Sequence, residues 1–105
     1  MTTTFDKREE GFENQFVHDE ELKFKATARR DRLLGLWAAE KLGLSGPAAD
    51  TYAKALIVAR IDGHDVFGRI RGDFAAKGVA QSDDQIRRVM LELMGRAVSE
   101  IRAGR

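Results

Sequence analysis

The sequence contains no cysteine, only one proline, and no apolar run that could cross a membrane. Without cysteine the chain can form no disulfide, no thiolate nucleophile and no thiolate metal site. A membrane-spanning helix needs about 20 apolar residues in succession, so we expect no membrane insertion. The N-terminus is acidic where a secretory signal needs a basic flank, which favours a cytoplasmic protein.

A strong net charge is also missing, because 18 basic residues nearly balance 17 acidic ones and leave a formal charge of +1. Neutralising several phosphates needs a larger basic surplus, which argues against nucleic acid as the main partner. The two signs are nevertheless unevenly placed. Residues 1–21 carry seven acidic and two basic side chains, whereas residues 22–105 carry ten acidic and sixteen basic. The chain is therefore an acidic segment attached to a basic body.

The acidic segment has few apolar residues and cannot bury enough surface to offset its chain entropy. We therefore predict an N-terminal arm at residues 1–18, flexible or marginally helical, and one folded domain at residues 19–105. Spacings of seven and four residues place Phe5, Phe12 and Phe16 on one helical face. Burying three phenylalanines supplies about 5–9 kcal/mol, against a cost of about 2–5 kcal/mol for folding on binding. The arm is predicted to bind a partner's groove, with folding back onto the domain as the open alternative.

The folded domain is predicted to be all-α, because no stretch alternates apolar and polar residues as a strand does. Apolar residues recur every three or four positions in four segments, at about 19–42, 47–61, 64–77 and 82–103. Ser82 and Gln85 have the spacing of a capping box at the start of the last segment. Short connections between the segments predict an antiparallel four-helix bundle.

The same periodicity predicts which side chains face the core. In the first two helices the predicted inward positions are Leu22, Ala26, Leu33, Leu36 or Trp37, Ala39, Ala49, Tyr52, Ala53, Leu56, Ile57 and Ile61. In the last two they are Val66, Phe67, Ile70, Phe74, Ile86, Val89, Met90, Leu93, Met94, Ala97 and Ile101.

The sequence offers little for catalysis or for binding a cofactor. Its two histidines, His18 and His64, lie at an arm–domain junction and a helix start, where a residue without chemical function is the favoured interpretation of each. His18 is the better candidate for a pH switch, because acidic residues follow it. Gly63 and Gly68 copy the spacing of a phosphate-binding loop, but the Lys-Ser/Thr pair and the preceding strand are missing. With no nucleophile–base pair and no metal constellation, we predict a protein that is not an enzyme and holds no cofactor or metal.

Basic residues cluster at the start of the domain, where Lys23, Lys25, Arg29 and Arg30 fall within eight positions. A solvated helix face is the simplest interpretation, and a patch that docks on an acidic partner is the alternative. From the residues alone, a helical adaptor and a small nucleic-acid-binding domain also remain open as functions.

Five stretches of the chain form a distinctive set: residues 3–9 with Phe12-Glu13, and residues 24–30, 33–39, 65–67 and 82–88. The most specific is Leu-Leu-Gly-Leu-Trp-Ala-Ala at 33–39. Together these stretches resemble the zeta subunit of alphaproteobacterial F-type ATP synthases. The resemblance implies an inhibitor of ATP hydrolysis, monomeric when free, that reaches the inner membrane only through the synthase. By analogy with the mitochondrial ATPase inhibitor protein, the arm would insert at a catalytic alpha–beta interface and reach gamma.

The resemblance also implies roles for residues of the arm. Phe5, Phe12 and Phe16 would be apolar anchors, and the charges that would pair within the crevice are Asp6, Arg8, Glu9 and Glu13. Gly11 departs from the family pattern, where a better helix former is expected, and it predicts weaker inhibition because glycine costs about 1 kcal/mol in a helix. Weak ATP or ADP binding by the folded domain is a secondary hypothesis to which no residue is assigned.

Overall fold

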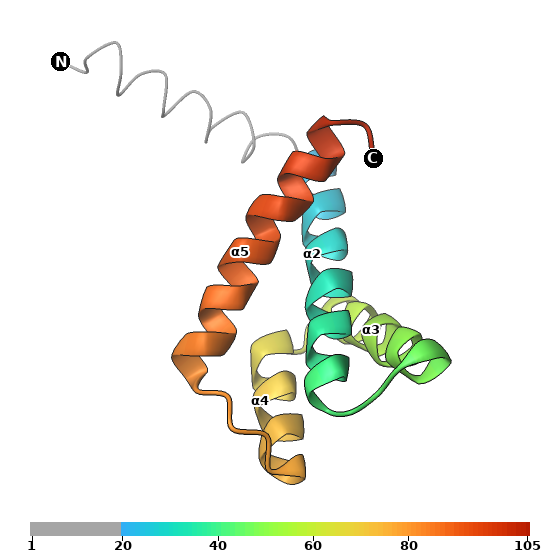
Figure 1. Cartoon of the computed structure of the whole chain (residues 1–105). Coiled ribbons are helices and arrows are strands. Elements are labelled where there is room, and N and C mark those ends of the chain that lie inside the picture. The colour runs from blue at the N-terminus through green and yellow to red at the C-terminus, as the bar shows by residue number, and fades with distance from the viewer. Residues whose placement is uncertain (1–19) are drawn as a thin grey trace, which may run out of the picture.

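The computed structural model describes residues 20–105, and within this range the chain forms four helices and no strand (Figure 1). The helices are α2 (Glu20–Lys41), α3 (Gly46–Ile61), α4 (Val66–Lys77) and α5 (Asp83–Arg102). The predicted all-α, four-helix architecture is confirmed, with helix ends within a few residues of those predicted. The predicted arm, residues 1–18, lies outside the described residues. Helix α2 begins two residues after it.

Local signals in the sequence set the helix ends. The capping box of α5 forms as predicted: the Gln85 backbone N–H donates to Ser82 Oγ at 3.1 Å, and the Ser82 N–H donates to Gln85 Oε1 at 2.8 Å. At the start of α4, Asp65 Oδ1 accepts from the Phe67 N–H at 3.1 Å. Gly78 ends α4 with φ of 68°, a conformation that glycine adopts without steric cost.

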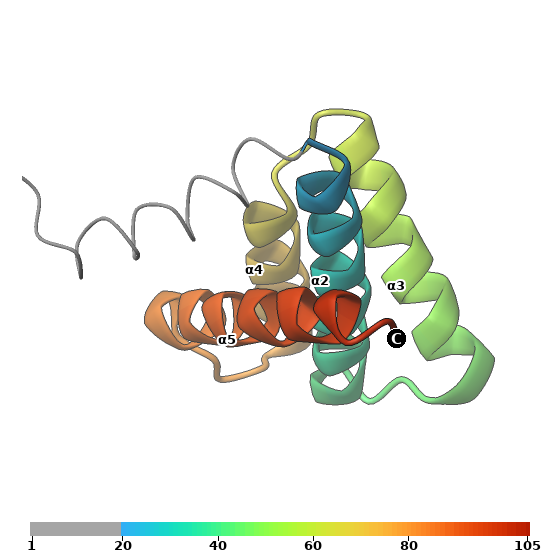
Figure 2. The same cartoon turned by 90° about the horizontal axis from the view of Figure 1, so that it is seen from above.

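Helix α2 is the centre of the molecule and packs against both α3 and α5 (Figures 1 and 2). Helix α3 runs antiparallel to α2, as predicted from their short connection, whereas α5 lies across α2 obliquely (Figures 1 and 2). One apolar cluster joins the four helices, and its largest fully buried members are Leu34, Leu56, Ile70, Phe74 and Ile86. The Trp37 ring packs edge-on against Phe74, with ring centroids 5.6 Å apart.

The predicted core face of α4 is confirmed, whereas on α5 only Ile86 and Ala97 are fully buried and the other predicted residues are partly buried. The core face of α2 is shifted. Leu34, Gly35 and Ala38 are buried on α2, whereas Leu33 and Leu36 are only partly buried. The reason is that α2 has neighbours on two sides, so small residues face the close contact with α3. On α3, the prediction for Ile61 was wrong: its side chain is 68% exposed, because the helix ends there beyond the contact with α2.

Candidate functional site

The residues predicted to carry the inhibitory role lie outside the described residues. They are Phe5, Asp6, Arg8, Glu9, Phe12, Glu13 and Phe16. What the structure does place is their point of attachment, because α2 begins at Glu20, directly after this segment. The arm is therefore joined to the central helix of the folded domain.

The first turns of α2 expose the N-terminal half of the predicted basic patch. Lys23 and Lys25 are both exposed, and Lys25 Nζ lies 3.0 Å from Glu21 Oε1, four residues earlier on the helix. Between the two lysines, Phe24 is 67% exposed, an unusual fraction for a large apolar side chain. Because consecutive residues of a helix point in different directions, these three exposed side chains surround the start of α2 rather than sharing one face.

Arg29 has a structural partner on α5. Its Nη1 atom lies 3.6 Å from Glu100 Oε1, and its Nη2 donates to the Arg105 carbonyl at 2.5 Å. Glu100 also accepts a hydrogen bond from Arg96, which lowers the pKa of the Glu100 carboxyl, with the positive charge of Arg29 adding in the same direction. Arg29 therefore holds the end of α5 against α2.

Arg30 is drawn into an ion-pair network that the sequence analysis missed. The Asp31 carboxylate is only 1% exposed, and it accepts from Arg30 Nε at 2.8 Å and from Arg60 Nε on α3. The Arg30 side chain is itself 11% exposed. Asp31 precedes the buried Leu34, Gly35 and Ala38 by three, four and seven residues, so all four lie on one helical face. This periodicity could have predicted that Asp31 is buried. The four basic residues thus do not form one free cationic patch.

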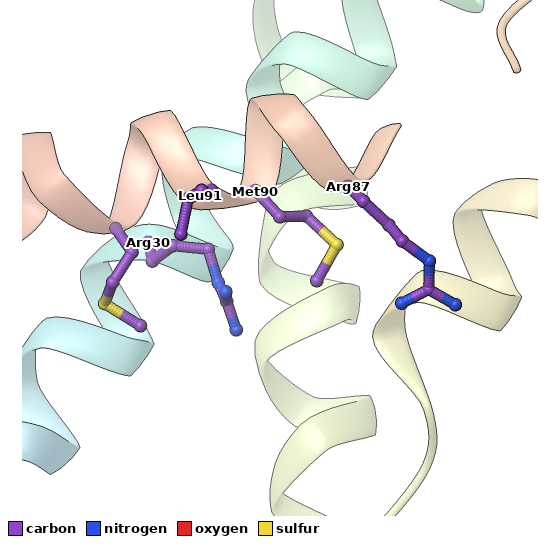
Figure 3. Close-up of a pocket in the computed structure, with 5 residues that line it drawn as sticks. Arg30, Arg87, Met90 and Leu91 are labelled. Atoms are coloured by element: carbon purple, nitrogen blue, oxygen red, sulfur yellow. The ribbon is translucent and has the colours of Figure 1, made fainter. Parts of the chain in front are cut away.

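A small groove lies between α2 and α5 on another face. It has a volume of about 260 Å³ and is lined by Arg30, Arg87, Met90, Leu91 and Met94 (Figure 3). Leu91 is 76% exposed. Met90 and Met94 belong to the predicted core stripe, but they are only partly buried because α5 crosses α2 obliquely. A wider groove of about 500 Å³ runs along the N-terminal half of α2 and the C-terminal end of α5, lined by Phe24, Lys25, Ala28, Arg29, Ile101, Gly104 and Arg105.

Tyr52 and His64 are two further titratable residues in the described part of the chain. Tyr52 Oη donates to Asp73 Oδ2 at 2.6 Å, and burial raises the pKa of Tyr52 above its ordinary value, with this hydrogen bond adding to the shift. His64 is exposed before α4. In this part of the chain no group of three His, Cys, Asp or Glu side chains could hold a metal ion. None of its helices is both long and apolar enough to cross a membrane.

Comparison with known families gives one result that covers nearly the whole chain. A family model described as ATPase inhibitor subunit zeta matches residues 1–100. This range includes the arm, helices α2 to α4 and most of α5. A comparison with curated proteins yields no match.

Proposed function

Because the chain belongs to the ATPase inhibitor subunit zeta family, we propose that it blocks ATP hydrolysis by an F-type ATP synthase by inserting residues 1–18 at a catalytic alpha–beta interface near gamma. The partners would be the alpha, beta and gamma subunits of the catalytic head. The observation that carries the proposal is that the family match begins at residue 1, so the phenylalanine-bearing acidic arm belongs to the shared sequence.

The chemistry of the arm supports insertion into a crevice. Phe5, Phe12 and Phe16 would occupy apolar pockets along one side of the inserted helix, while the acidic residues and Arg8 would pair with charges at its rim. A crevice that excludes water strengthens such ion pairs, provided that each charge finds a partner. An inserted helix would obstruct rotation in the hydrolytic direction.

The folded domain would serve as the anchor for the arm. Because α2 starts at Glu20, docking of the domain holds the arm close to its target and raises its effective concentration there. Lys23, Phe24 and Lys25 are the proposed docking residues, since all three are exposed around the start of α2. The sequence placed Arg29 and Arg30 in the same patch, but both pair with carboxylates within the domain. Their proposed role is to hold α2 in place rather than to contact the partner.

The proposal is tested by measuring ATP hydrolysis and ATP synthesis by the cognate synthase with the full-length chain and with residues 19–105. Removing the arm should abolish inhibition of hydrolysis while the helical circular dichroism of the domain persists. A full-length variant with Phe5, Phe12 and Phe16 changed to alanine should behave like the truncated chain. Inhibition that survives both changes would mean that the arm is not the inhibitory element.

Docking by the domain can be tested separately from the action of the arm. Changing Lys23 and Lys25 to glutamate should slow association with the synthase and reduce its dependence on salt, because complementary charge mainly accelerates encounter. Lys54→Glu combined with Lys77→Glu is the matched control, because these exposed lysines on α3 and α4 give the same change in net charge. Equal effects of the two changes would show that only overall charge matters and would refute a local docking surface.

The strength of inhibition should depend on Gly11. Replacing it with alanine lowers the cost of forming a helix by about 1 kcal/mol, which corresponds to about a fivefold gain in affinity if the arm binds as a helix. The measurement is the concentration of the chain that gives half-maximal inhibition of hydrolysis. A loss of potency would argue that the arm binds in another conformation.

A further inference from the structure

The groove lined by Arg30, Arg87, Met90, Leu91 and Met94 is open to solvent. Its volume of about 260 Å³ lies below the range of about 300–1,000 Å³ that is usual for small-molecule sites. The groove is therefore suited to a single large side chain. Methionine suits such a surface, because its flexible thioether adapts in shape and makes favourable contacts with aromatic rings.

We infer that this groove receives the phenyl ring of Phe12 from the chain's own N-terminal arm when the protein is free of its target. The consequence for inhibition rests on the proposed function, whereas the contact itself does not. While the ring is in the groove, the arm would be withheld from the synthase. The apparent affinity for the target would then be reduced in proportion to the fraction of arm that remains released.

Electrostatics favours the acidic arm as the occupant of this groove. One buried carboxylate, Asp31, faces both Arg30 and Arg60, so this network has an excess of positive charge. At the other end of the groove, the Arg87 guanidinium lies 4.0 Å from the centre of the Phe67 ring rather than against a carboxylate. In the wider groove, Lys25 is matched by Glu21, but Glu100 faces both Arg29 and Arg96, so positive charge is also in excess there. Charge therefore suits the acidic arm at either groove, and the two methionines select the smaller groove for a phenyl ring.

The length of the arm selects Phe12 among its phenylalanines. Arg30 lies ten residues into α2, about 15 Å along the helix from Glu20. Phe16 precedes Glu20 by four residues and can span at most about 14 Å, whereas Phe12 precedes it by eight and can span about 28 Å. Phe5 would also reach, but through a longer loop with a greater entropic cost of closure.

The test uses the full-length chain, which has methionine only at positions 1, 90 and 94 and no native cysteine. A nitroxide is attached to a Thr3→Cys variant, and the ε-methyl signals of Met90 and Met94, together with the backbone amide signals, are recorded by NMR with the nitroxide oxidised and reduced. We expect selective loss of both methyl signals in the oxidised sample. Adding Phe12→Ala should restore them, whereas the control Phe24→Ala, which removes an exposed ring outside the groove, should leave the loss unchanged.

Three results would overturn the inference. Intact Met90 and Met94 signals would show that the arm does not visit the groove. Loss centred on Ile101 and Gly104 would place the arm in the wider groove instead. Loss in a mixture of isotope-labelled chain and separately spin-labelled chain would show that a second copy is the occupant. None of these results bears on whether the arm inhibits the synthase, because no ATPase is present.

Discussion

Replacing Gly35 with alanine should destabilise the protein, although alanine is the better helix former. A Cβ atom at this position would lie 2.6 Å from the Cα and 2.9 Å from the Cβ of Ala53 on α3. Carbon atoms attract one another best at about 3.5–4.0 Å, so α2 and α3 would have to separate by about 1 Å. The neighbouring atoms are backbone and a methyl group, neither of which can rotate away.

The expected size of the effect follows from two opposing contributions. Helix propensity favours the alanine by about 0.5–1 kcal/mol, while an extra methyl group in a tight contact costs typically about 1–3 kcal/mol. The net loss should therefore be about 1–2 kcal/mol. Since 1 kcal/mol shifts the melting temperature of a domain this small by about 4–8 °C, the change is easily measured.

Gly72→Ala is the matched control, because an added Cβ at this helical position meets no atom within 4 Å. It should stabilise the protein by about 0.5–1 kcal/mol through helix propensity alone. Urea unfolding followed by circular dichroism compares the two variants, with an unchanged urea dependence confirming the same transition. If Gly35→Ala proved as stable as Gly72→Ala, the close approach of α2 and α3 would be refuted.

Three further changes test other contacts. Asp31→Ala should cost about 3 kcal/mol in urea unfolding, because it leaves two arginines without their buried carboxylate. Ser82→Ala should lower stability by about 1 kcal/mol, whereas Ser45→Ala, at an N-cap without a side-chain hydrogen bond, should leave the melting temperature nearly unchanged. The raised pKa of Tyr52 means that its contribution to stability is present below about pH 10 and is lost as pH rises further. The fall in urea stability above that pH should therefore be shallower in Tyr52→Phe; an equal fall would refute the assignment.

The proposed contact of Phe12 with the methionine groove and the proposed insertion into the synthase compete for the same side chain. The arm would thus have two apolar environments, one within the free protein and one in the target. Binding to the target must then exceed the free energy of the internal contact as well as the cost of ordering the arm. A variant that is changed in the groove but keeps Phe12 would release the arm. It should inhibit more strongly without any change at the target interface.

Most of the folded domain could be predicted from its sequence because the deciding signals are local. Ser82 and Gln85 form a capping box within one helical turn, and Gly78 ends α4 through its own backbone conformation. The core residues of α4 were also predicted, since this short helix has one clear apolar face. The resemblance also named a family, and the family match at residues 1–100 confirmed that the chain belongs to the ATPase inhibitor subunit zeta family. The mechanism of inhibition stays a prediction.

The candidate site was predicted less completely, because charge along a sequence does not reveal pairing in space. Lys23 and Lys25 are exposed as the docking hypothesis requires. Arg29 pairs with Glu100 on α5, and Arg30 pairs with the buried Asp31. The sequence does not reveal these pairings, because Glu100 is far away along the chain and the burial of Asp31 depends on tertiary packing. The roles of the arm residues remain predictions.

The sequence by itself determined the helical class, the helix ends and the contrast in charge between residues 1–21 and 22–105, all of which depend on neighbours along the chain. Only the tertiary structure decided which face of α2 is buried, because that face depends on two helices packing against it from different sides. It also decided that Asp31 is buried with two arginines and that Met90 and Met94 line a groove. These features follow from the tight contact at Gly35 and the oblique crossing of α5, which no local pattern specifies.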